Sequence, residues 1–266
     1  LNNSSLLESL RPFNDLGFVP TMGGIHKGHL SLINKSNKLC KKTIVSIFVN
    51  PKQFNNKNDY KKYPRNIKKD LKILKRLKVN YVYIPTKKQI FNSKNPIIIR
   101  LSQKDKILCA KYRKGHFEGV IDVMTRLVKK IKPAKIFMGE KDFQQFILVK
   151  RFIEKNFQSK IILCKTIRNK NKLALSSRNL HLSKNALIVA EKISRNLISF
   201  KKQISQQPLK KKKILSKKNE LTKKFHIDIE YFEVRDINNL FISKKMNNSK
   251  IFIAYYLNKI RLIDNF

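Results

Sequence analysis

The first fifty residues contain two short apolar runs on either side of a segment with helical periodicity, and this pattern constrains the fold more than any other. The runs "GFVPTM" (17–22) and "TIVSIFVN" (43–50) are rich in β-branched residues and bounded by turn residues, as buried strands are. Between them, residues 27–39 carry apolar side chains at broadly helical spacing. This order predicts a βαβ unit with two parallel strands.

The alternation of strand and helix continues to about residue 167. Strand-like runs lie at 81–85, 134–139 and 160–167, and helical patterns lie at 66–78, 117–132 and 142–156. Strands that alternate with helices predict an α/β fold, with a parallel sheet covered by helices on both faces.

The pattern changes after residue 168. Two helical segments, 183–200 and 209–224, the second interrupted by "KKKK" (210–213), precede three closely spaced strand-like runs at 228–236, 250–257 and 260–264. Helices followed by adjacent strands predict a smaller α+β domain with an antiparallel sheet. We therefore expect one domain over residues 1–167 and a second over residues 168–266.

The net charge is +43, from 60 basic and 17 acidic residues, and it raises the question of a polyanionic partner. A nucleic acid or an anionic membrane surface would suit this charge. A general compositional bias is the favoured interpretation, because the lysines are spread almost everywhere and accompany much Asn and Ile. We expect nucleic acid to bind only through non-specific electrostatics, and the run 210–213 to be a solvated helix face.

The cysteines and the apolar runs indicate a cytoplasmic protein. Three widely spaced cysteines without a CxxC pair suggest neither a zinc site nor a disulfide framework, and a reducing compartment fits them best. The apolar runs are well short of the ~20 residues of a membrane span. The first residues do not show the pattern of a signal peptide.

The stretch "TMGGIHKGH" (21–29) lies between the first expected strand and its helix. Ligands of open parallel sheets bind beyond the carboxyl ends of the strands, where backbone N–H groups and the helix dipole favour an anion. His26 and His29 are one helical turn apart and can both donate hydrogen bonds to a phosphate. The alternatives are a pair of metal ligands, for which no third ligand is evident nearby, and a pair of capping or core histidines.

Three further polar clusters follow expected strand ends or the domain junction. "FMGEKDFQQ" (137–145) offers Lys141 to a phosphate and two glutamines to a hydroxylated substrate, or is a plain capped helix start. "LALSSRN" (173–179) places two hydroxyls beside an arginine, as an oxyanion clamp does, or is a polar turn. "SIFVNPKQF" (46–54) ends in amides that suit a small substrate, or in ordinary turn chemistry.

Together these stretches resemble the pantoate–β-alanine ligase family. The resemblance covers nearly the whole chain in the family's order and includes "VPTMGGIHKGHLSLI", "DYKKYPR", "RKGHFEGV", "MGEKDFQQ", "LALSSRN" and "IRLIDN". It implies a Rossmann-like nucleotidyltransferase domain of the His-x-Gly-His type with a smaller C-terminal domain, usually in a homodimer. It also implies that pantoate attacks the α-phosphate of Mg²⁺-bound ATP, and that β-alanine then attacks the pantoyl adenylate to give pantothenate, a precursor in coenzyme A biosynthesis, and AMP.

The resemblance also assigns site residues. His29 takes the place of the family's proton donor, beside His26, and Lys141 and Arg178 are further catalytic candidates. The implied substrate contacts are Gln53 and Gln145 for pantoate, with Gln53 also near β-alanine, and Tyr63 and Arg113 on the same side. The implied ATP-binding residues are Met22, Gly23, Gly24, Ile25, His26, Lys27, Gly28, His29, Gly139, Glu140, Lys141, Asp142, Ile167, Leu175, Ser176, Ser177 and Arg178.

The chain departs from the family pattern at a few positions, mainly in the loop before the serine clamp. Asn169 and Lys172 replace a glutamate and part of an acidic-glycine pair, Leu175 replaces a common methionine, and Lys114 replaces a proline. We expect the loop at 169–172 to differ in shape or mobility.

Two other functions remain as alternatives to the ligase. One is a nucleotidyltransferase of the same fold that makes a stable product, which would leave Gln53 and "MGEKDFQQ" without a carboxylate substrate. The other is a nucleic-acid-binding protein, which predicts binding that falls steeply with salt. The sequence lacks the aromatic-interleaved basic strand of an RNA-recognition sheet.

Overall fold

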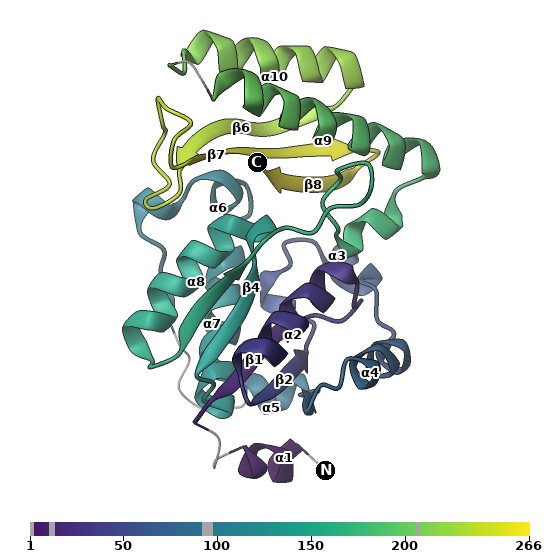
Figure 1. Cartoon of the computed structure of the whole chain (residues 1–266), viewed down its shortest axis with the longest axis vertical. Helices are drawn as coiled ribbons and strands as arrows, with labels where there is room; N and C mark the ends of the chain where they lie inside the picture. The colour runs from purple at the N-terminus through teal and green to yellow at the C-terminus, as the bar shows by residue number, and fades with distance from the viewer. Residues whose placement is uncertain (1–2, 11–13, 92–97, 206–207) are drawn as a thin grey trace. The chain divides into compact units, whose positions relative to one another are not determined.

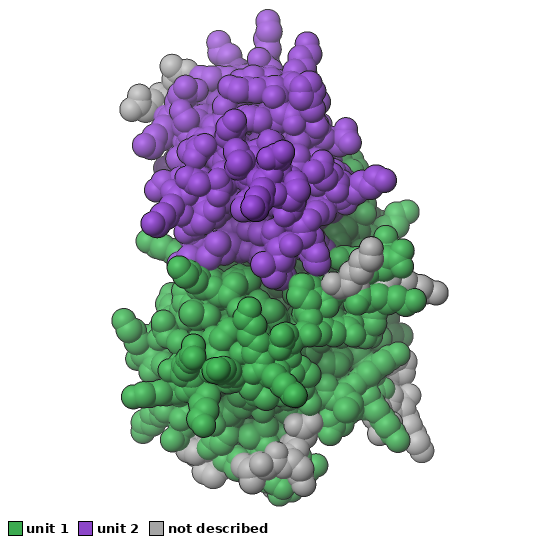
Figure 2. Space-filling model, turned by 90° about the vertical axis from the view of Figure 1, so that its right-hand side faces the viewer, with its two compact units in different colours: residues 1–140, 145–165 green, residues 141–144, 166–266 purple. Residues whose placement is uncertain are grey.

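The computed structural model describes residues 3–10, 14–91, 98–205 and 208–266. The chain forms two compact units, coloured separately in Figure 2. Unit 1 comprises Leu1–Glu140 and Gln145–Lys165, and unit 2 comprises Lys141–Gln144 and Thr166–Phe266. The segment 141–144 thus belongs with the C-terminal half although it lies between residues of unit 1.

Unit 1 is built on a five-stranded parallel sheet in the order β3-β2-β1-β4-β5. Strands β1, β2 and β4 of this sheet are labelled in Figure 1. Its strands are β1 (Leu16–Thr21), β2 (Lys42–Ile47), β3 (Tyr81–Tyr83), β4 (Lys135–Gly139) and β5 (Lys160–Cys164). β1 pairs with β2 in register from Leu16 opposite Lys42 to Thr21 opposite Ile47. The central strands are almost wholly buried, as expected of strands covered on both faces.

Helices and short 3₁₀ turns connect these strands. The helices are α1 (Asn3–Ser9), α2 (Lys27–Leu39), α3 (Lys57–Lys62), α4 (Ile67–Arg76), α5 (Lys87–Phe91), α6 (Leu108–Tyr112), α7 (His116–Ile131) and α8 (Phe143–Asn156), and the turns are η1 (Pro51–Gln53), η2 (Gln103–Asp105) and η3 (Glu140–Asp142). Helix α2 packs on β1 and β4. Its buried Leu32 and Ile33 join Val19, Val45 and Phe137 in one apolar cluster.

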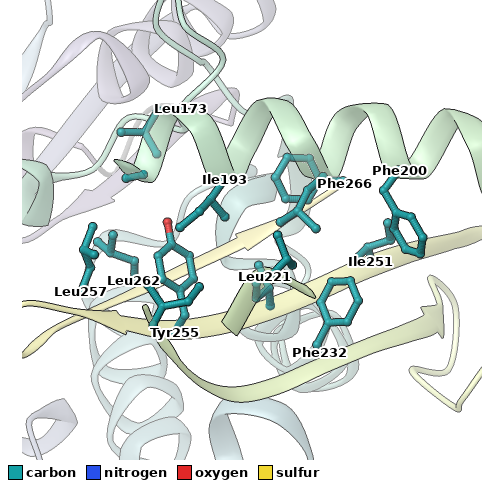
Figure 3. Packing of buried hydrophobic residues seen from close by; sticks show 14 of the residues in the cluster. Leu173, Ile193, Phe200, Leu221, Phe232, Ile251, Tyr255, Leu257, Leu262 and Phe266 are labelled. Carbon is teal, nitrogen blue, oxygen red and sulfur yellow. The ribbon is translucent and has the colours of Figure 1, made fainter. Parts of the chain in front are cut away.

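Unit 2 is an antiparallel sheet with two long helices. Its elements are η4 (Ser177–His181), α9 (Lys184–Ile204), α10 (Lys211–Phe225), β6 (Asp228–Asp236), β7 (Ser249–Leu257) and β8 (Ile260–Asn265). The strand order is β6-β7-β8, and both pairs are antiparallel. Figure 3 shows side chains of α9, such as Ile193 and Phe200, facing Phe232, Ile251 and other apolar residues of the sheet.

The expected α/β architecture with a smaller C-terminal α+β part is confirmed. The predicted strands at 43–50 and 160–167 are shorter in the structure, since β2 ends at Ile47 and β5 at Cys164. The predicted interruption of the second helix by the lysine run 210–213 is wrong. Lys210 is the N-cap of α10, and the helix begins at Lys211 and continues through the run. Exposed lysines are good helix formers when their ammonium groups stay in water. Within the described residues, no helix is long and apolar enough to cross a membrane.

Candidate active site

The turn after β1 adopts a conformation that only glycine takes readily. Gly23 and Gly24 both have positive φ, at 83° and 63°. A carboxylate from α4 holds the turn, because Asp70 accepts hydrogen bonds from the backbone N–H groups of Gly24 and Ile25, both at 2.9 Å. The N–H of Gly23 is engaged as well, by Thr21 Oγ1 at 3.2 Å. The N–H groups of Gly23, Gly24 and Ile25 are therefore bonded to protein oxygens.

His26 and His29 form a reciprocal cap at the start of α2. The N–H of Gly28 donates to His26 Nδ1 at 3.1 Å, and the N–H of His26 donates to His29 Nδ1 at 3.3 Å. A backbone N–H only donates, so both Nδ1 atoms act as acceptors. The proton of each neutral imidazole then lies on Nε2. The pair, with ring centroids 4.1 Å apart, thus has the capping role, and the phosphate-donor role stays a prediction.

His29 is a neutral imidazole at physiological pH. Burial, with a smaller contribution from the neighbouring His26, lowers the pKa of His29 to about 3. A charged ring would also have to give up the hydrogen bond from His26. His29 therefore offers a phosphate a neutral N–H donor in the free protein.

This lowered pKa predicts acid-sensitive stability. Unfolded His29 takes up a proton near its ordinary pKa of 6.5 while folded His29 stays neutral down to about 3. Its contribution is therefore complete above pH 6.5 and is lost as the pH falls through this window, by at most about 1.4 kcal/mol per pH unit. Between pH 7 and pH 5, we expect urea denaturation to show a loss of stability about 1–2 kcal/mol larger in the wild type than in His29→Asn. Equal losses in the two proteins would contradict the assignment.

Gln53 lies in η1, just beyond the carboxyl end of β2, and contacts the glycine turn. Its side-chain Nε2 lies 2.8 Å from Met22 Sδ, and its Oε1 accepts from Asn50 Nδ2 at 3.2 Å. The structure thus brings together two motifs that are 31 residues apart, Met22 from the expected ATP stretch and Gln53 from the expected pantoate contacts.

The backbone of η1 is seated on the start of α7. The carbonyl oxygen of Gln53 is 2.7 Å from His116 Nδ1 and accepts from Arg113 at 3.0 Å. Asn50 donates to the carbonyl oxygen of Gly119 at 2.9 Å. Arg113 therefore lies beside Gln53 and supports the backbone that carries it.

The other expected residues of unit 1 come at or after the carboxyl ends of β2 and β4. Tyr63 packs edge-on against Phe54, the neighbour of Gln53, with ring centroids 5.7 Å apart. Gly139 ends β4, which lies next to β1 in the sheet, and Glu140 follows it. Gln145 is in the first turn of α8 and is partly exposed.

In unit 2, the segment with Lys141 and Asp142 is tied to the C-terminal sheet. Asn265 donates from its side chain to the carbonyl oxygen of Lys141 at 2.9 Å, and Phe143 packs against Phe252. The Lys141 ammonium is 4.0 Å from the exposed Asp142 carboxylate, and its charge also favours the ionised form of Asp264, opposing the rise that burial causes in the pKa of that carboxyl.

A short hairpin links the remaining expected nucleotide residues. The N–H of Leu175 donates to the carbonyl oxygen of Ile167 at 3.0 Å, and an antiparallel bridge joins Arg168 to Ala174. Ser176 then caps η4, accepting from the N–H of Arg178, and Ser177 opens that turn. The structure therefore places Ile167 beside the "LSSR" stretch.

Arg168 fixes this hairpin to β8. Its guanidinium donates to both carboxylate oxygens of Asp264, at 2.7 and 2.9 Å, and to the carbonyl oxygen of Asn265. Burial raises the pKa of Asp264, and the bidentate bond to Arg168 opposes that rise. The pair joins the "IRLIDN" stretch at the chain end to the clamp stretch.

The departing loop at 169–172 is closed by a carboxylate from α9. Glu191, which is buried, accepts from the side-chain amides of Asn169 and Asn171, both at 2.7 Å. Lys172 completes the turn with a φ of 72°, a left-handed conformation that glycine takes without strain.

Replacing Lys172 with glycine is expected to raise the free energy of unfolding by about 0.5–1 kcal/mol. The gain from removing left-handed strain exceeds the extra chain entropy of glycine in the unfolded state. Urea denaturation measures the change. The control is Lys170→Gly, at the neighbouring exposed position, and it is expected to lower the free energy of unfolding. A loss of similar size in both variants would show that the backbone of Lys172 is not strained.

Two residues that sequence reasoning missed support the site, since Asp70 holds the glycine turn and His116 holds the Gln53 backbone. Asn50, which the sequence offered as an amide for a small substrate, holds the start of α7. Asp70 had a signal, as the one acidic residue of the otherwise basic and apolar helix "IKKDLKILKR". Groups of three or more His, Cys, Asp or Glu side chains arranged for a metal ion are absent from the described residues.

Comparisons with known proteins agree with this architecture. The profile of the family described as pantoate-beta-alanine ligase matches residues 3–266. A pantothenate synthetase of Francisella tularensis subsp. novicida is 38% identical, over 98% of this chain and 93% of its own length.

Solved structures show the same fold. A pantothenate synthetase from Thermus thermophilus superposes with a TM-score of 0.91 at 28% identity, over 98% of this chain and 96% of its own. A pantoate-beta-alanine ligase from Francisella tularensis, complexed with beta-gamma ATP and beta-alanine, gives a TM-score of 0.82 at 37% identity, over 100% and 95%. With the family profile spanning nearly every residue, this chain belongs to the pantoate–β-alanine ligase family.

Proposed function

We propose that this ligase joins pantoate to β-alanine in two steps, through a pantoyl adenylate. In the first step a pantoate carboxylate oxygen bonds to the α-phosphorus of ATP and pyrophosphate leaves. In the second step the β-alanine amine bonds to the acyl carbon, AMP leaves, and the amine proton passes to water or a base. The solved ligase complexed with beta-gamma ATP and beta-alanine supports this choice of substrates.

The two Nε2–H donors at the start of α2 carry the proposal. Displacement at the α-phosphate depends on positioning and on stabilising the charge that develops on the phosphate oxygens. His26 and His29, held by their Nδ1 atoms, present fixed donors beyond the carboxyl end of β1. In this account His29 donates a hydrogen bond from a neutral ring, while the chain needs no protein nucleophile.

Further nucleotide contacts are proposed from the residues that the family resemblance assigns to ATP. Lys141 and Arg178 neutralise phosphate oxygens, and Ser176 and Ser177 donate hydroxyl hydrogen bonds. Mg²⁺ enters as part of the ATP substrate, with oxygen ligands from phosphates and water. The predicted ATP contacts of Lys27, Gly139, Glu140, Asp142, Ile167 and Leu175 belong to the same proposal.

Pantoate binds next to the glycine turn in this account. Gln53 is held on two sides, by Asn50 and by the residues that grip its carbonyl oxygen, so its amide is preorganised for a polar substrate. Its contact with Met22 supports a pantoate site next to the stretch that is proposed to bind ATP. Gln145, Tyr63 and Arg113 are proposed as further contacts on the substrate side.

Product analysis with substrates omitted one at a time tests this function. With Mg²⁺, ATP, pantoate and β-alanine together, we expect steady formation of AMP, pyrophosphate and pantothenate in equal amounts. Omitting either pantoate or β-alanine is expected to stop turnover beyond one equivalent of enzyme. Steady ATP cleavage without pantoate, or a stable adenylated product, would instead favour another nucleotidyltransferase.

The remaining expectations concern setting and assembly. We propose a cytoplasmic protein, and the buried thiols of Cys40, Cys109 and Cys164, which form no disulfide within the described residues, suit a reducing compartment. A homodimer stays a prediction from the family resemblance, to be measured by sedimentation. The domain division at residues 167 and 168 also stays a prediction, and non-specific binding of nucleic acid is expected to vanish at high salt.

A further inference from the structure

Asp70 is a buried acidic residue that the mechanism above does not use. Its relative exposure is 2%, and it comes from α4, 46 residues along the chain from the turn that it touches. Its two oxygens are divided between two consecutive backbone N–H groups, those of Gly24 and Ile25, each at 2.9 Å. Burying a carboxylate costs free energy unless hydrogen-bond donors satisfy its oxygens. The two N–H groups of the turn are such donors for Asp70.

The glycine turn that receives Asp70 has the geometry of an anion-binding site. Successive N–H groups in a turn with left-handed residues converge on one point and favour a negative charge there. Gly23 and Gly24 provide that conformation. A Cβ at Gly23 would lie 3.0 Å from Asp70 Oδ2, so the carboxylate fills the concavity closely.

The helix that carries Asp70 is itself fixed to the turn. Leu74, one helical turn after Asp70, is fully buried in the same apolar cluster as Ile25, the residue whose N–H Asp70 binds. Asn66 caps the start of α4 through the N–H of Lys69. The carboxylate and the side chain of Ile25 therefore hold the turn at two points, immediately before His26.

We propose that Asp70 is a positioning residue for adenylation, and that its carboxylate occupies the anion site of the glycine turn. With that site filled from within, ATP phosphates meet the Nε2–H donors of His26 and His29. The carboxylate fixes Ile25, Ile25 fixes the N-cap His26, and His26 fixes His29 through the reciprocal cap. This inference rests on the proposed function for its kinetic test only.

Removing the carboxylate and then supplying one in solution tests the proposal. Asp70→Ala is expected to lower kcat at least tenfold. Millimolar formate is expected to enter the vacated anion site and raise the kcat of this variant at least threefold. Chloride at equal ionic strength is expected to give no recovery. A residue that only stabilises the fold would not respond to formate. The exposed Asp228→Ala is the control, with unchanged kcat and no formate effect.

A spectroscopic test needs neither a folded Asp70→Ala variant nor turnover by the enzyme. In the wild type without substrate, ¹⁵N spectra are expected to show unprotonated Nδ1 atoms in both His26 and His29. In the near-isosteric Asp70→Asn, the Gly24 and Ile25 amide signals are expected to shift, and the ring-nitrogen signals are expected to show mixed tautomers. Unchanged ring signals in Asp70→Asn, or a kcat within twofold of wild type in a folded Asp70 variant, would overturn the proposal. Absence of AMP formation by the wild type would reject the ligase mechanism and leave this spectroscopic test valid.

Discussion

Replacing His29 with asparagine is expected to lower kcat by about 10²–10³-fold, the usual cost of removing one preorganised donor from a developing charge. The asparagine side chain is shorter than histidine and places its polar atoms near the position of Nδ1. It therefore retains an acceptor for the N–H of His26 and removes only the Nε2–H donor. Pyrophosphate release under saturating substrates measures the change.

His29→Gln is the complementary variant, because its amide nitrogen reaches the position of Nε2. It keeps a donor for the phosphate and loses the acceptor that closes the cap. We expect a smaller fall in kcat than in His29→Asn, accompanied by a lower free energy of unfolding, since a lost cap costs about 1 kcal/mol. His226→Asn, at the exposed left-handed end of α10, is the control with full activity. A kcat within threefold of wild type in His29→Asn would remove His29 from the chemistry.

Replacing Gly119 with alanine is expected to be the most damaging single-methyl change for pantoate binding. A Cβ at this position would lie 2.3 Å from the carbonyl oxygen of Lys52 and 3.1 Å from the N–H nitrogen of Gln53. Both neighbours are backbone atoms, so η1 must move away from α7. We expect a loss of about 3 kcal/mol of stability, which exceeds the helix-propensity gain of alanine. We also expect the KM for pantoate to rise at least tenfold and the KM for ATP to change less.

Leu127→Ala separates this local effect from general instability. Leu127 is buried two turns further along α7, and truncating it costs a comparable 2–5 kcal/mol through a cavity. The control is expected to lower the denaturation midpoint and to leave the KM for pantoate near that of wild type. Equal KM values in both variants would show that Gly119 does not position Gln53.

Much of the fold could be read from local patterns. The spacing of apolar residues located α2 and β6 within a residue, because their ends coincide with changes of polarity at Lys27 and Asp236. The short helix α3 was not predicted, because its six residues have little apolar periodicity. The N-cap Asn56 was its one local signal. The assignment of residues 141–144 to unit 2 depends on tertiary contacts, such as that of Asn265 with Lys141, which leave no trace in a local window.

The residues of the candidate site also divide into those that local sequence patterns indicate and those that only tertiary contacts reveal. The His-x-Gly-His stretch and Gln53 stand directly after strands, where the rule for parallel sheets places ligands. Asp70 and Glu191 act on backbone or amide groups far away in sequence, and their partners carry no complementary charge that a pattern would reveal. In a chain with 60 basic and 17 acidic residues, a buried carboxylate is itself a useful signal, and both of these acids are buried.

Pantoate-dependent exchange of labelled pyrophosphate into ATP tests the central claim most directly. If the pantoate carboxylate attacks the α-phosphate before β-alanine takes part, exchange requires pantoate, proceeds without β-alanine, and is lost in His29→Asn. The exchange reports the adenylation step alone, free of amide formation and product release. Exchange without pantoate, or an absolute requirement for β-alanine in a fully active preparation, would contradict a pantoyl adenylate formed at the His26–His29 pair.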